Sequence, residues 1–230
     1  MDITKIKGQH LSSVIAGHNE CQSCGYVGRE GDWTLIGFPC PNCKKPSDGG
    51  RMFFHVGILS TINLIQEFYH ADSSQTDDHL AVKGHHLAVV IFFCTLLEVL
   101  LEDFLREFMF KEGLKANVQE RLLKDNLFPR RRVEKLFPAL AGKTWKDAIA
   151  EAGAEVDRKP NPTIQEALDF YLKANTARNK CLHGGNKWAI GHQMSWKCLR
   201  HTPPLLDLFA WLHNRYVAEA GFVLSHPKAP

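Results

Sequence analysis

Four cysteines near the amino terminus form two closely spaced pairs. Cys21 and Cys24 make the first pair, and Cys40 and Cys43 make the second after fifteen intervening residues. Two tight turns with this spacing offer two thiolates each to one tetrahedral zinc ion. Four thiolates leave no open coordination position, so the spacing predicts a structural zinc and not a catalytic one. His18 lies near enough in the sequence to replace one cysteine, but we expect it to be an ordinary loop residue.

The surroundings of these cysteines favour a small module that zinc holds together. Gly25 supplies a permissive backbone after the first pair, and Pro41 stiffens the turn of the second. Residues 32–38 are β-prone and are predicted to form a hairpin between the pairs. The segment resembles a zinc ribbon, which we place within residues 1–56. About fifty residues bury too little surface to fold alone, so zinc would supply most of the folding free energy.

A second group of residues has the chemistry of RNA cleavage without a metal. Arg178 and Asn179 are adjacent, and four residues separate Arg178 from His183. Such cleavage needs a base, an acid and a cation for the charge that develops on the phosphate. His183 can transfer protons near neutral pH, and the planar, permanently charged guanidinium of Arg178 fits a phosphate. Asn179 lies four residues before His183 and so shares its helix face.

The spacing of Arg178 and His183 raises a geometric problem. Five residues turn an ideal helix by about 140° beyond a full turn, so the two side chains point apart. Either the helix loosens at His183, or two copies of the chain complete one another's site.

An acidic residue in an apolar stretch is a third candidate. Glu98 stands among large apolar residues, so no rotation of its helix gives it a clearly polar face. A buried carboxylate needs a partner, which Arg178 or His183 would provide. The alternative is a half-exposed glutamate without a catalytic role, and Glu102 and Asp103 are lesser candidates.

The Arg-Asn-x3-His sequence near the end of a late helix resembles the HEPN superfamily (higher eukaryotes and prokaryotes nucleotide-binding), whose signature is Arg-x(4–6)-His. The resemblance covers about residues 57–220, and the motif helix and the helix over residues 79–111 carry it specifically. It implies a metal-independent endoribonuclease that acts on RNA as a homodimer, with Arg178 and His183 as catalytic residues. It also implies a role as a toxin or in antiviral defence, with a protein inhibitor or activator as a further partner.

Apolar periodicity predicts helices throughout the rest of the chain. Thr163 and Glu166 have the spacing of a capping box that opens the motif helix, and Gly184-Gly185 is expected to end it in the left-handed conformation. Pro203-Pro204 is expected to open the last helix. The predicted helices begin at Ile58 and cover residues 79–111, 117–126, 130–140, 145–152, 163–183 and 205–220. The predicted fold class is therefore mainly α, with an all-α HEPN-like helical bundle over residues 57–230 preceded by the small β zinc ribbon.

Composition and charge exclude several classes of protein. The 230 residues are 44% hydrophobic and 23% charged, which is typical of a globular protein and excludes fibrous or wholly disordered chains. A formal charge of +3 is too small for the whole chain to coat nucleic acid, so RNA contacts must come from local patches. Five residues are candidates for such patches, although a charge run is usually a solvated face: Arg130, Arg131, Arg132, Lys180 and Lys187.

The sequence also indicates where in the cell the protein is found and which functions are alternatives to RNA cleavage. No secretory signal is visible at the start, and the most apolar stretch, residues 87–97, is too short to span a membrane. We therefore expect a cytoplasmic protein without a membrane partner. The main alternative to the nuclease is a non-catalytic RNA-binding, nucleotide-binding or adaptor protein with a structural zinc ribbon. A zinc-ribbon regulator of DNA lacks a basic recognition helix, and a zinc-dependent hydrolase lacks an open metal site.

Overall fold

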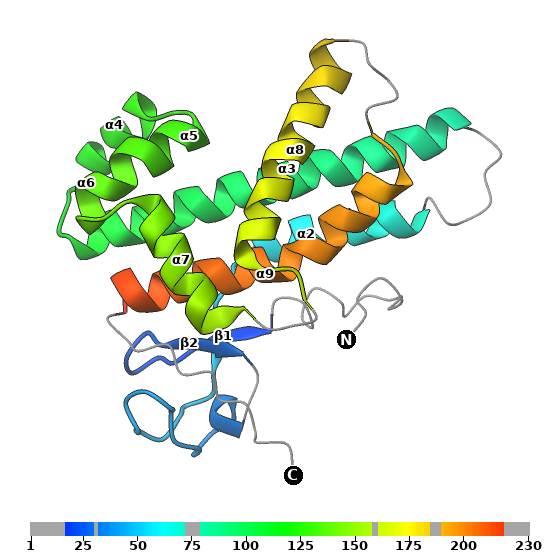
Figure 1. Cartoon of the computed structure of the whole chain (residues 1–230). Helices are drawn as coiled ribbons and strands as arrows, with labels where there is room; N and C mark the ends of the chain where they lie inside the picture. Colours follow the sequence, from blue (N-terminus) through cyan, green and yellow to red (C-terminus); the bar gives the residue numbers. More distant parts are fainter. Residues whose placement is uncertain (1–16, 30–31, 72–78, 158–160, 185–189, 219–230) are drawn as a thin grey trace. The chain divides into compact units, whose positions relative to one another are not determined.

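The computed structural model describes residues 17–29, 32–71, 79–157, 161–184 and 190–218, which form two compact units (Figure 1). The first unit contains the described residues of His55–Val99 and Arg158–Leu206. The second contains those of Gly17–Phe54, Leu100–Asp157 and Asp207–Pro230. The unit boundary after Phe54 lies close to the predicted domain boundary after residue 56. The cysteine-rich segment nevertheless shares its unit with helical residues from two later parts of the chain.

The described residues are mainly helical with one small antiparallel sheet, which confirms the mainly α class. Within the described ranges, none of the helices combines the length and the apolar character that a bilayer crossing requires.

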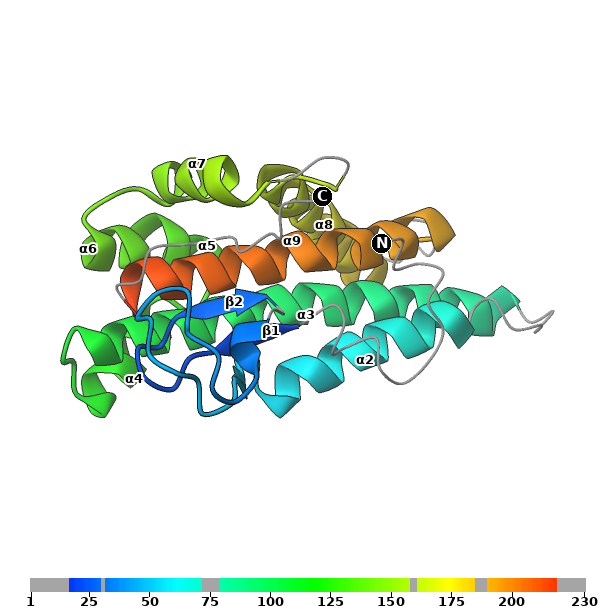
Figure 2. The ribbon, with the colours of Figure 1, turned by 90° about the horizontal axis from the view of Figure 1, so that it is seen from below.

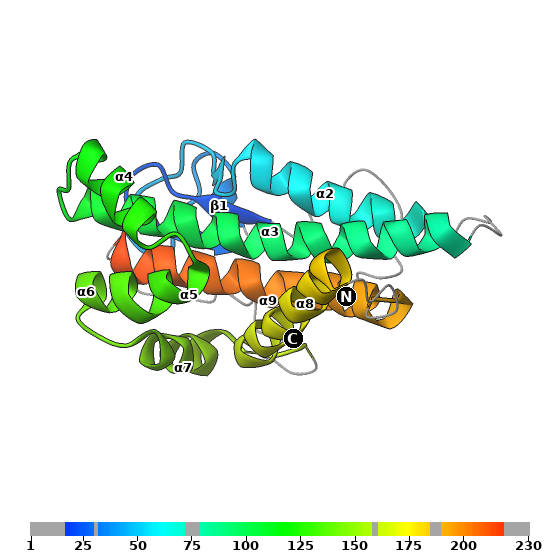
Figure 3. The same ribbon diagram turned by 90° about the horizontal axis from the view of Figure 1, so that it is seen from above.

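Four helical segments build the first unit. They are α2 (Val56–Ala71), residues 79–99 of α3 (His79–Lys111), α8 (Ile164–His183) and residues 192–206 of α9 (His192–Tyr216). α2 lies beside the first part of α3 (Figures 2 and 3), and Phe68 and Phe92 stack there with ring centroids 5.8 Å apart. α8 crosses this part of α3 steeply (Figure 1), and the rings of Phe93 and Phe170 approach to 5.7 Å.

Both ends of α8 lie where predicted, but the conformation of Gly184 at its carboxyl end differs from the prediction. The Glu166 backbone N–H donates to Thr163 Oγ1 at 3.1 Å, and the Thr163 N–H donates to the Glu166 carboxylate at 2.7 Å, so the capping box is confirmed. Gly184 has a φ of −100°, so the prediction of a left-handed residue is wrong at this position. Its N–H instead continues the helical pattern by donating to the Lys180 carbonyl at 3.1 Å. Gly185 lies outside the described residues.

The last helix begins earlier than predicted. α9 runs through Pro203 and Pro204 from His192, so the proline pair does not open it. Two prolines inside a helix remove two backbone donors, at a cost of about 3 kcal/mol each. The residues on both sides, Leu199 and Leu205 among them, are fully buried, and this packing outweighs the cost. The Thr202 hydroxyl also donates to the Cys198 carbonyl at 2.9 Å.

The sheet belongs to the second unit. Its strands β1 (His18–Glu20), β2 (Val27–Arg29) and β3 (Arg51–Met52) are antiparallel in the order β2-β1-β3. The predicted hairpin over residues 32–38 is wrong, because a 3-10 turn, η2 (Asp32–Thr34), stands there. Trp33 is buried while Leu35, Ile36 and Phe38 are exposed, so the apolar residues do not alternate between two faces. The hairpin of β1 and β2 instead encloses the first cysteine pair.

The other helices of the second unit follow α3 in the chain, and α4 lies at the end of α3 (Figure 3). They are α4 (Ala116–Asp125), α5 (Pro129–Arg131), the π-helical turn η3 (Arg132–Leu136), α6 (Phe137–Ala141) and α7 (Trp145–Val156). The helices predicted over residues 117–126 and 130–140 have their bounds within one residue, whereas α7 runs four residues beyond its predicted end at residue 152. Thr144 caps α7 by accepting from the Asp147 N–H at 3.2 Å. Pro138, two residues after the end of the π turn, supplies no N–H for a regular α-helical bond.

Aromatic rings form the core of the second unit. Phe104 lies within 6.4 Å, centroid to centroid, of four other rings: Phe108, Phe137, Phe209 and Tyr216. Trp145 meets Phe137 edge to face at 5.0 Å.

Candidate functional site

The two cysteine pairs form turns of the same construction. In the first, the Gly25 N–H donates to the Cys21 carbonyl at 2.8 Å; in the second, the Lys44 N–H donates to the Cys40 carbonyl at 3.0 Å. Gly25 and Lys44 have positive φ angles of 70° and 61°. The left-handed residue turns the chain back after each pair, which brings both thiols of a turn to one side.

The four thiols form a group that can hold a metal ion. All four Sγ atoms lie within 4.8 Å of one another. Cys21 Sγ is 4.0 Å from Cys43 Sγ, and Cys24 Sγ is 3.8 Å from Cys40 Sγ. Sulfur atoms at about 2.3 Å from a tetrahedral zinc are separated by about 3.8 Å, so the donor set and its spacing fit zinc.

The thiols do not ionise uniformly in their own surroundings. Burial raises the pKa of Cys40 to about 12. Burial also opposes ionisation of Cys24, but hydrogen bonds, the largest from Asn42, lower the pKa of that thiol to about 7. A bound cation is therefore needed to keep all four sulfurs deprotonated at neutral pH, and binding it releases protons.

Asp207 of α9 holds the two paired strands of the second unit. His18 and Arg29 face each other across β1 and β2, and both reach this carboxylate. His18 Nε2 donates at 2.8 Å, and Arg29 donates through Nε at 2.9 Å and Nη2 at 2.6 Å. Burial alone would raise the pKa of Asp207, but the hydrogen bond from His18 and the charge of Arg29 lower it below its ordinary value. His18 thus anchors the strand and does not join the four cysteines.

Two further residues of α9 extend this attachment to the first cysteine turn. The Asn214 side chain accepts from the Val27 N–H and donates to the Val27 carbonyl, both at 2.7 Å, and so completes the open edge of β2. His213 Nε2 donates to the Gly25 carbonyl at 3.1 Å, directly after Cys24. Sequence analysis missed these contacts because no local pattern links residues that lie almost 190 positions apart.

In the first unit, α3 and α8 bring Glu98 and Arg178 together. Arg178 Nη1 lies 3.4 Å from Glu98 Oε1, and the two side chains are 20% and 35% exposed. Of the two partners that the sequence offered for Glu98, the structure places Arg178 beside it. The separation is at the long end of a hydrogen bond, so the guanidinium is held loosely and keeps donors for another acceptor.

Two buried neighbours of this pair were missed by sequence analysis. Tyr171 lies two helical turns before Arg178 on the same side of α8 and hydrogen-bonds to Glu98. Burial and the nearby Glu98 carboxylate raise the pKa of Tyr171. Cys94 lies one turn before Glu98, and burial raises the pKa of its thiol to about 12 in spite of the Arg178 charge. The apolar periodicity of both helices marks these residues as core, which conceals their contact with the ion pair.

His183 and Asn179 lie on the exposed side of α8. Both side chains are exposed, and Leu172 and Thr176 share their face of the helix. α8 stays helical through His183, so the helix does not loosen to turn His183 toward Arg178. Asn179 remains in contact with Arg178, whose Nε donates to Asn179 Oδ1 at 3.4 Å.

The five predicted RNA-binding residues have different surroundings. Arg130 and Arg131 are exposed, as is Lys180, whereas Arg132 is only 6% exposed. Arg132 Nη2 pairs with Glu102 Oε2 at 2.9 Å, so the exposed run contains two arginines and not three. Lys187 lies outside the described residues.

The lesser acidic candidates belong to the second unit. Glu102 pairs with Arg106 at 2.8 Å in addition to Arg132. Burial opposes ionisation of Glu102, but the two arginines lower its pKa below the ordinary value. Glu102 is therefore fully engaged in joining α3 to the turn after α5. Asp103 also has contacts of its own.

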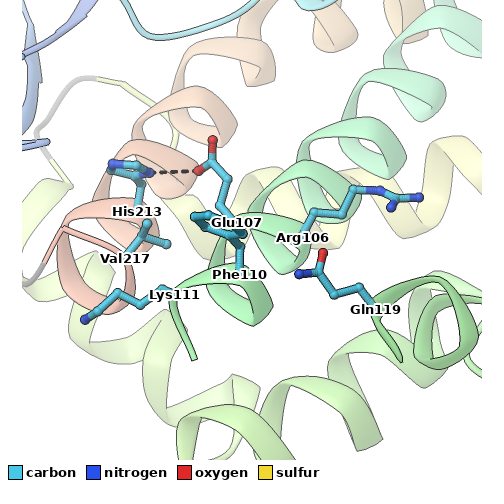
Figure 4. A pocket seen from close by; sticks show the side chains of 7 residues that line it. All are labelled: Arg106, Glu107, Phe110, Lys111, Gln119, His213 and Val217. Carbon is cyan, nitrogen blue, oxygen red and sulfur yellow. Dashed lines mark hydrogen bonds and ion pairs between the residues drawn. The ribbon is translucent and has the colours of Figure 1, made fainter. Parts of the chain in front are cut away.

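The second unit also contains an open groove of about 520 Å³ (Figure 4). Its polar groups bind one another: Glu107 accepts from His213 Nδ1 at 2.9 Å, and Arg106 pairs with Glu120 at 2.7 Å. Gln119 Nε2 donates to the Leu114 carbonyl at 2.8 Å. We assign no catalytic group to this groove, whose lining residues are Arg106, Glu107, Phe110, Lys111, Gln119, His213 and Val217.

Comparisons of the chain with protein families, with curated proteins and with solved structures find no match.

Proposed function

We propose that this protein is a metal-independent endoribonuclease of the HEPN type and that the four cysteines hold a structural zinc. The observation that carries the proposal is the contact of Arg178 with Glu98 and Asn179 on a helix that also displays His183. A loosely paired arginine and an exposed histidine on the same helix supply the charge and the proton transfer that cleavage at a phosphate needs.

Each residue has a distinct role in this mechanism. Arg178 binds the scissile phosphate and stabilises the charge that builds up on its oxygens. His183 takes the 2′-hydroxyl proton as that oxygen bonds to the phosphorus, and returns a proton to the 5′-oxygen as its bond to the phosphorus breaks, so the products carry 2′,3′-cyclic phosphate and 5′-hydroxyl ends. Glu98 is a positioning residue that orients the guanidinium, and Asn179 adds a hydrogen-bonding group beside it.

The arrangement of α8 supports a homodimeric site. Arg178 and His183 diverge by about 140° on a helix that remains regular to His183. A single copy therefore presents the cation and the proton carrier in different directions. A second copy with its own α8 against the first would bring the arginine of one chain to the histidine of the other.

The zinc has no part in this chemistry. Four sulfur ligands close its coordination shell, and its contribution is to fold residues 17–54 against Asp207 and Asn214.

Purified wild type and the variants Arg178→Ala, His183→Ala and Lys173→Ala test the proposal. The proteins are incubated with total RNA in excess EDTA, and their folding is checked by circular dichroism. We expect cleavage by wild type and by Lys173→Ala, a control at an exposed position of the same helix, and at least a hundredfold loss in the other two variants. Full activity of His183→Ala would refute the mechanism. RNA binding by wild type without any cleavage would favour the non-catalytic alternative.

A further inference from the structure

The connection between α4 and α5 presents two large apolar side chains to solvent. Leu127 and Phe128 are neighbours in the sequence, and each is 63% exposed. Single exposed apolar residues are common, whereas exposed apolar side chains that adjoin one another are the more informative sign of a contact surface.

The turn that carries them is braced from inside. Arg132 Nε donates to the Asn126 carbonyl at 3.1 Å, while the same buried guanidinium pairs with Glu102. The Asn126 side chain donates to the Leu122 carbonyl at 2.9 Å, and the Arg132 N–H donates to the Phe128 carbonyl at 3.1 Å. Since the backbone on both sides is fixed, the turn would lose little conformational entropy when a ligand binds Leu127 and Phe128.

Cations flank this apolar pair on both sides. Lys124 precedes it, together with Asp125, whose carboxylate lies 3.9 Å from Arg121, and Arg130 and Arg131 follow it; all of these side chains are exposed. Arg130 Nε pairs with Glu134 Oε1 at 2.7 Å, but both side chains are exposed, so a phosphate can compete for this arginine at small cost.

We propose that the α4–α5 turn is a contact site for single-stranded RNA, in which Phe128 stacks on an unpaired base and Arg130 and Arg131 bind the adjacent phosphates. The choice of RNA as the ligand rests on the proposed function. Stacking on an aromatic ring tolerates any base, and a guanidinium binds phosphate through paired hydrogen bonds. A duplex hides its base faces, so the ring selects unpaired RNA. Leu127 lies beside the ring and covers the ribose.

Glu134 limits the affinity of this site. Its carboxylate occupies Arg130 and adds a negative charge close to where the phosphate binds. Replacing Glu134 by glutamine releases Arg130, so this variant binds RNA more tightly than wild type.

Fluorescence anisotropy with a labelled single-stranded RNA dodecamer of mixed sequence tests the site. The full chain carries His183→Ala throughout, so that bound RNA stays intact. We expect Phe128→Leu to weaken binding roughly tenfold, since stacking contributes about 1–3 kcal/mol per base, and Phe128→Trp to preserve it. The double variant Arg130→Gln/Arg131→Gln should also reduce the dependence of log affinity on log salt by about 1.4, which is the share of two phosphates. Lys146→Gln, an exposed lysine of α7, is the matched control and should bind as the parent does.

The leucine variant separates RNA stacking from other contacts. An anionic bilayer or an acidic protein would accept leucine in place of phenylalanine, whereas a stacked base would not. Unchanged RNA affinity of Phe128→Leu overturns the inference, as does equal affinity for a fully paired RNA hairpin. Binding to phosphatidylserine vesicles that depends on the arginines but not on the ring would instead assign the turn to a membrane surface. Phe128-dependent binding by a protein that never cleaves RNA would sustain this inference and refute the nuclease.

Discussion

Asp207 allows a quantitative test of how the cysteine-rich segment is held in the second unit. Asp207→Ala removes the acceptor of the bond from His18, whose side chain is 2% exposed, and of two bonds from Arg29, whose side chain is 51% exposed. Leaving the buried His18 donor without a partner costs about 1–3 kcal/mol. The exposed Arg29 contact adds at most about 1 kcal/mol. We therefore expect a loss of about 2–3 kcal/mol in the free energy of unfolding.

Thermal unfolding followed by tryptophan fluorescence measures this loss, because Trp33 and Trp211 are both buried in the second unit. The expected decrease in Tm is roughly 5–10 °C, and zinc should pass more quickly to a chromogenic chelator. Asp125→Ala is the matched control, since Asp125 is 65% exposed and 3.9 Å from Arg121, and it should change the stability by less than about 0.5 kcal/mol. A Tm for Asp207→Ala within 1 °C of wild type would show that the carboxylate does not hold the strands and would refute the reasoning.

Three further predictions concern the pH dependence of the Asp207 contact, the zinc site and the shared RNA-cleavage site. The folded-state pKa of Asp207 lies below its ordinary value of 3.8, so the stabilisation by this carboxylate is complete above that pH and is lost as the pH falls through the folded-state pKa. Urea unfolding should therefore show that wild type is more stable than Asp207→Asn at pH 6 and that this difference shrinks below about pH 4. A difference that stays constant with pH would contradict this. The variant Cys24→Ser should lose the bound zinc, and its residues 17–54 should unfold, whereas the control Cys181→Ser should retain the metal. Mass spectrometry under native conditions measures the zinc, and Trp33 fluorescence measures the unfolding. A stoichiometric zinc in Cys24→Ser would exclude the four-sulfur site. Mixing Arg178→Ala with His183→Ala should restore about a quarter of wild-type RNA cleavage. Half of the randomly assembled dimers are then mixed, and each mixed dimer has one intact composite site out of two. A mixture as inactive as its components would argue against a shared site.

The parts of the structure that depend on near neighbours in the sequence could be predicted. The cysteine spacing fixes both metal-binding turns, because each pair is closed by hydrogen bonds within five residues. The capping box of Thr163 and Glu166 and the caps around α7 are equally local. Apart from α7, which runs further, and α9, which begins earlier, the helices with apolar periodicity lie close to their predicted bounds.

Features that depend on packing could not be predicted in this way. Arg132 is part of a basic run in the sequence, but Glu102 from another helix draws it inside. Pro203 and Pro204 signal a helix boundary, which the burial of the residues on either side overrides. Tyr171 looks like a core residue because it shares the buried face of α8 with apolar residues such as Ala167 and Ala174, and only the approach of α3 shows its contact with Glu98. The sequence identifies Glu98 as a residue that needs a partner, while the fold decides that this partner is Arg178.

The central claim is that Arg178 and His183 cleave RNA without a metal. The most direct measurement is an analysis of the RNA ends left by wild type and by the double variant Arg178→Ala/His183→Ala in excess EDTA. The account predicts 2′,3′-cyclic phosphate ends from wild type and intact RNA from the double variant. Identical fragments from both proteins, or no cleavage by a folded and dimeric wild type, would contradict it.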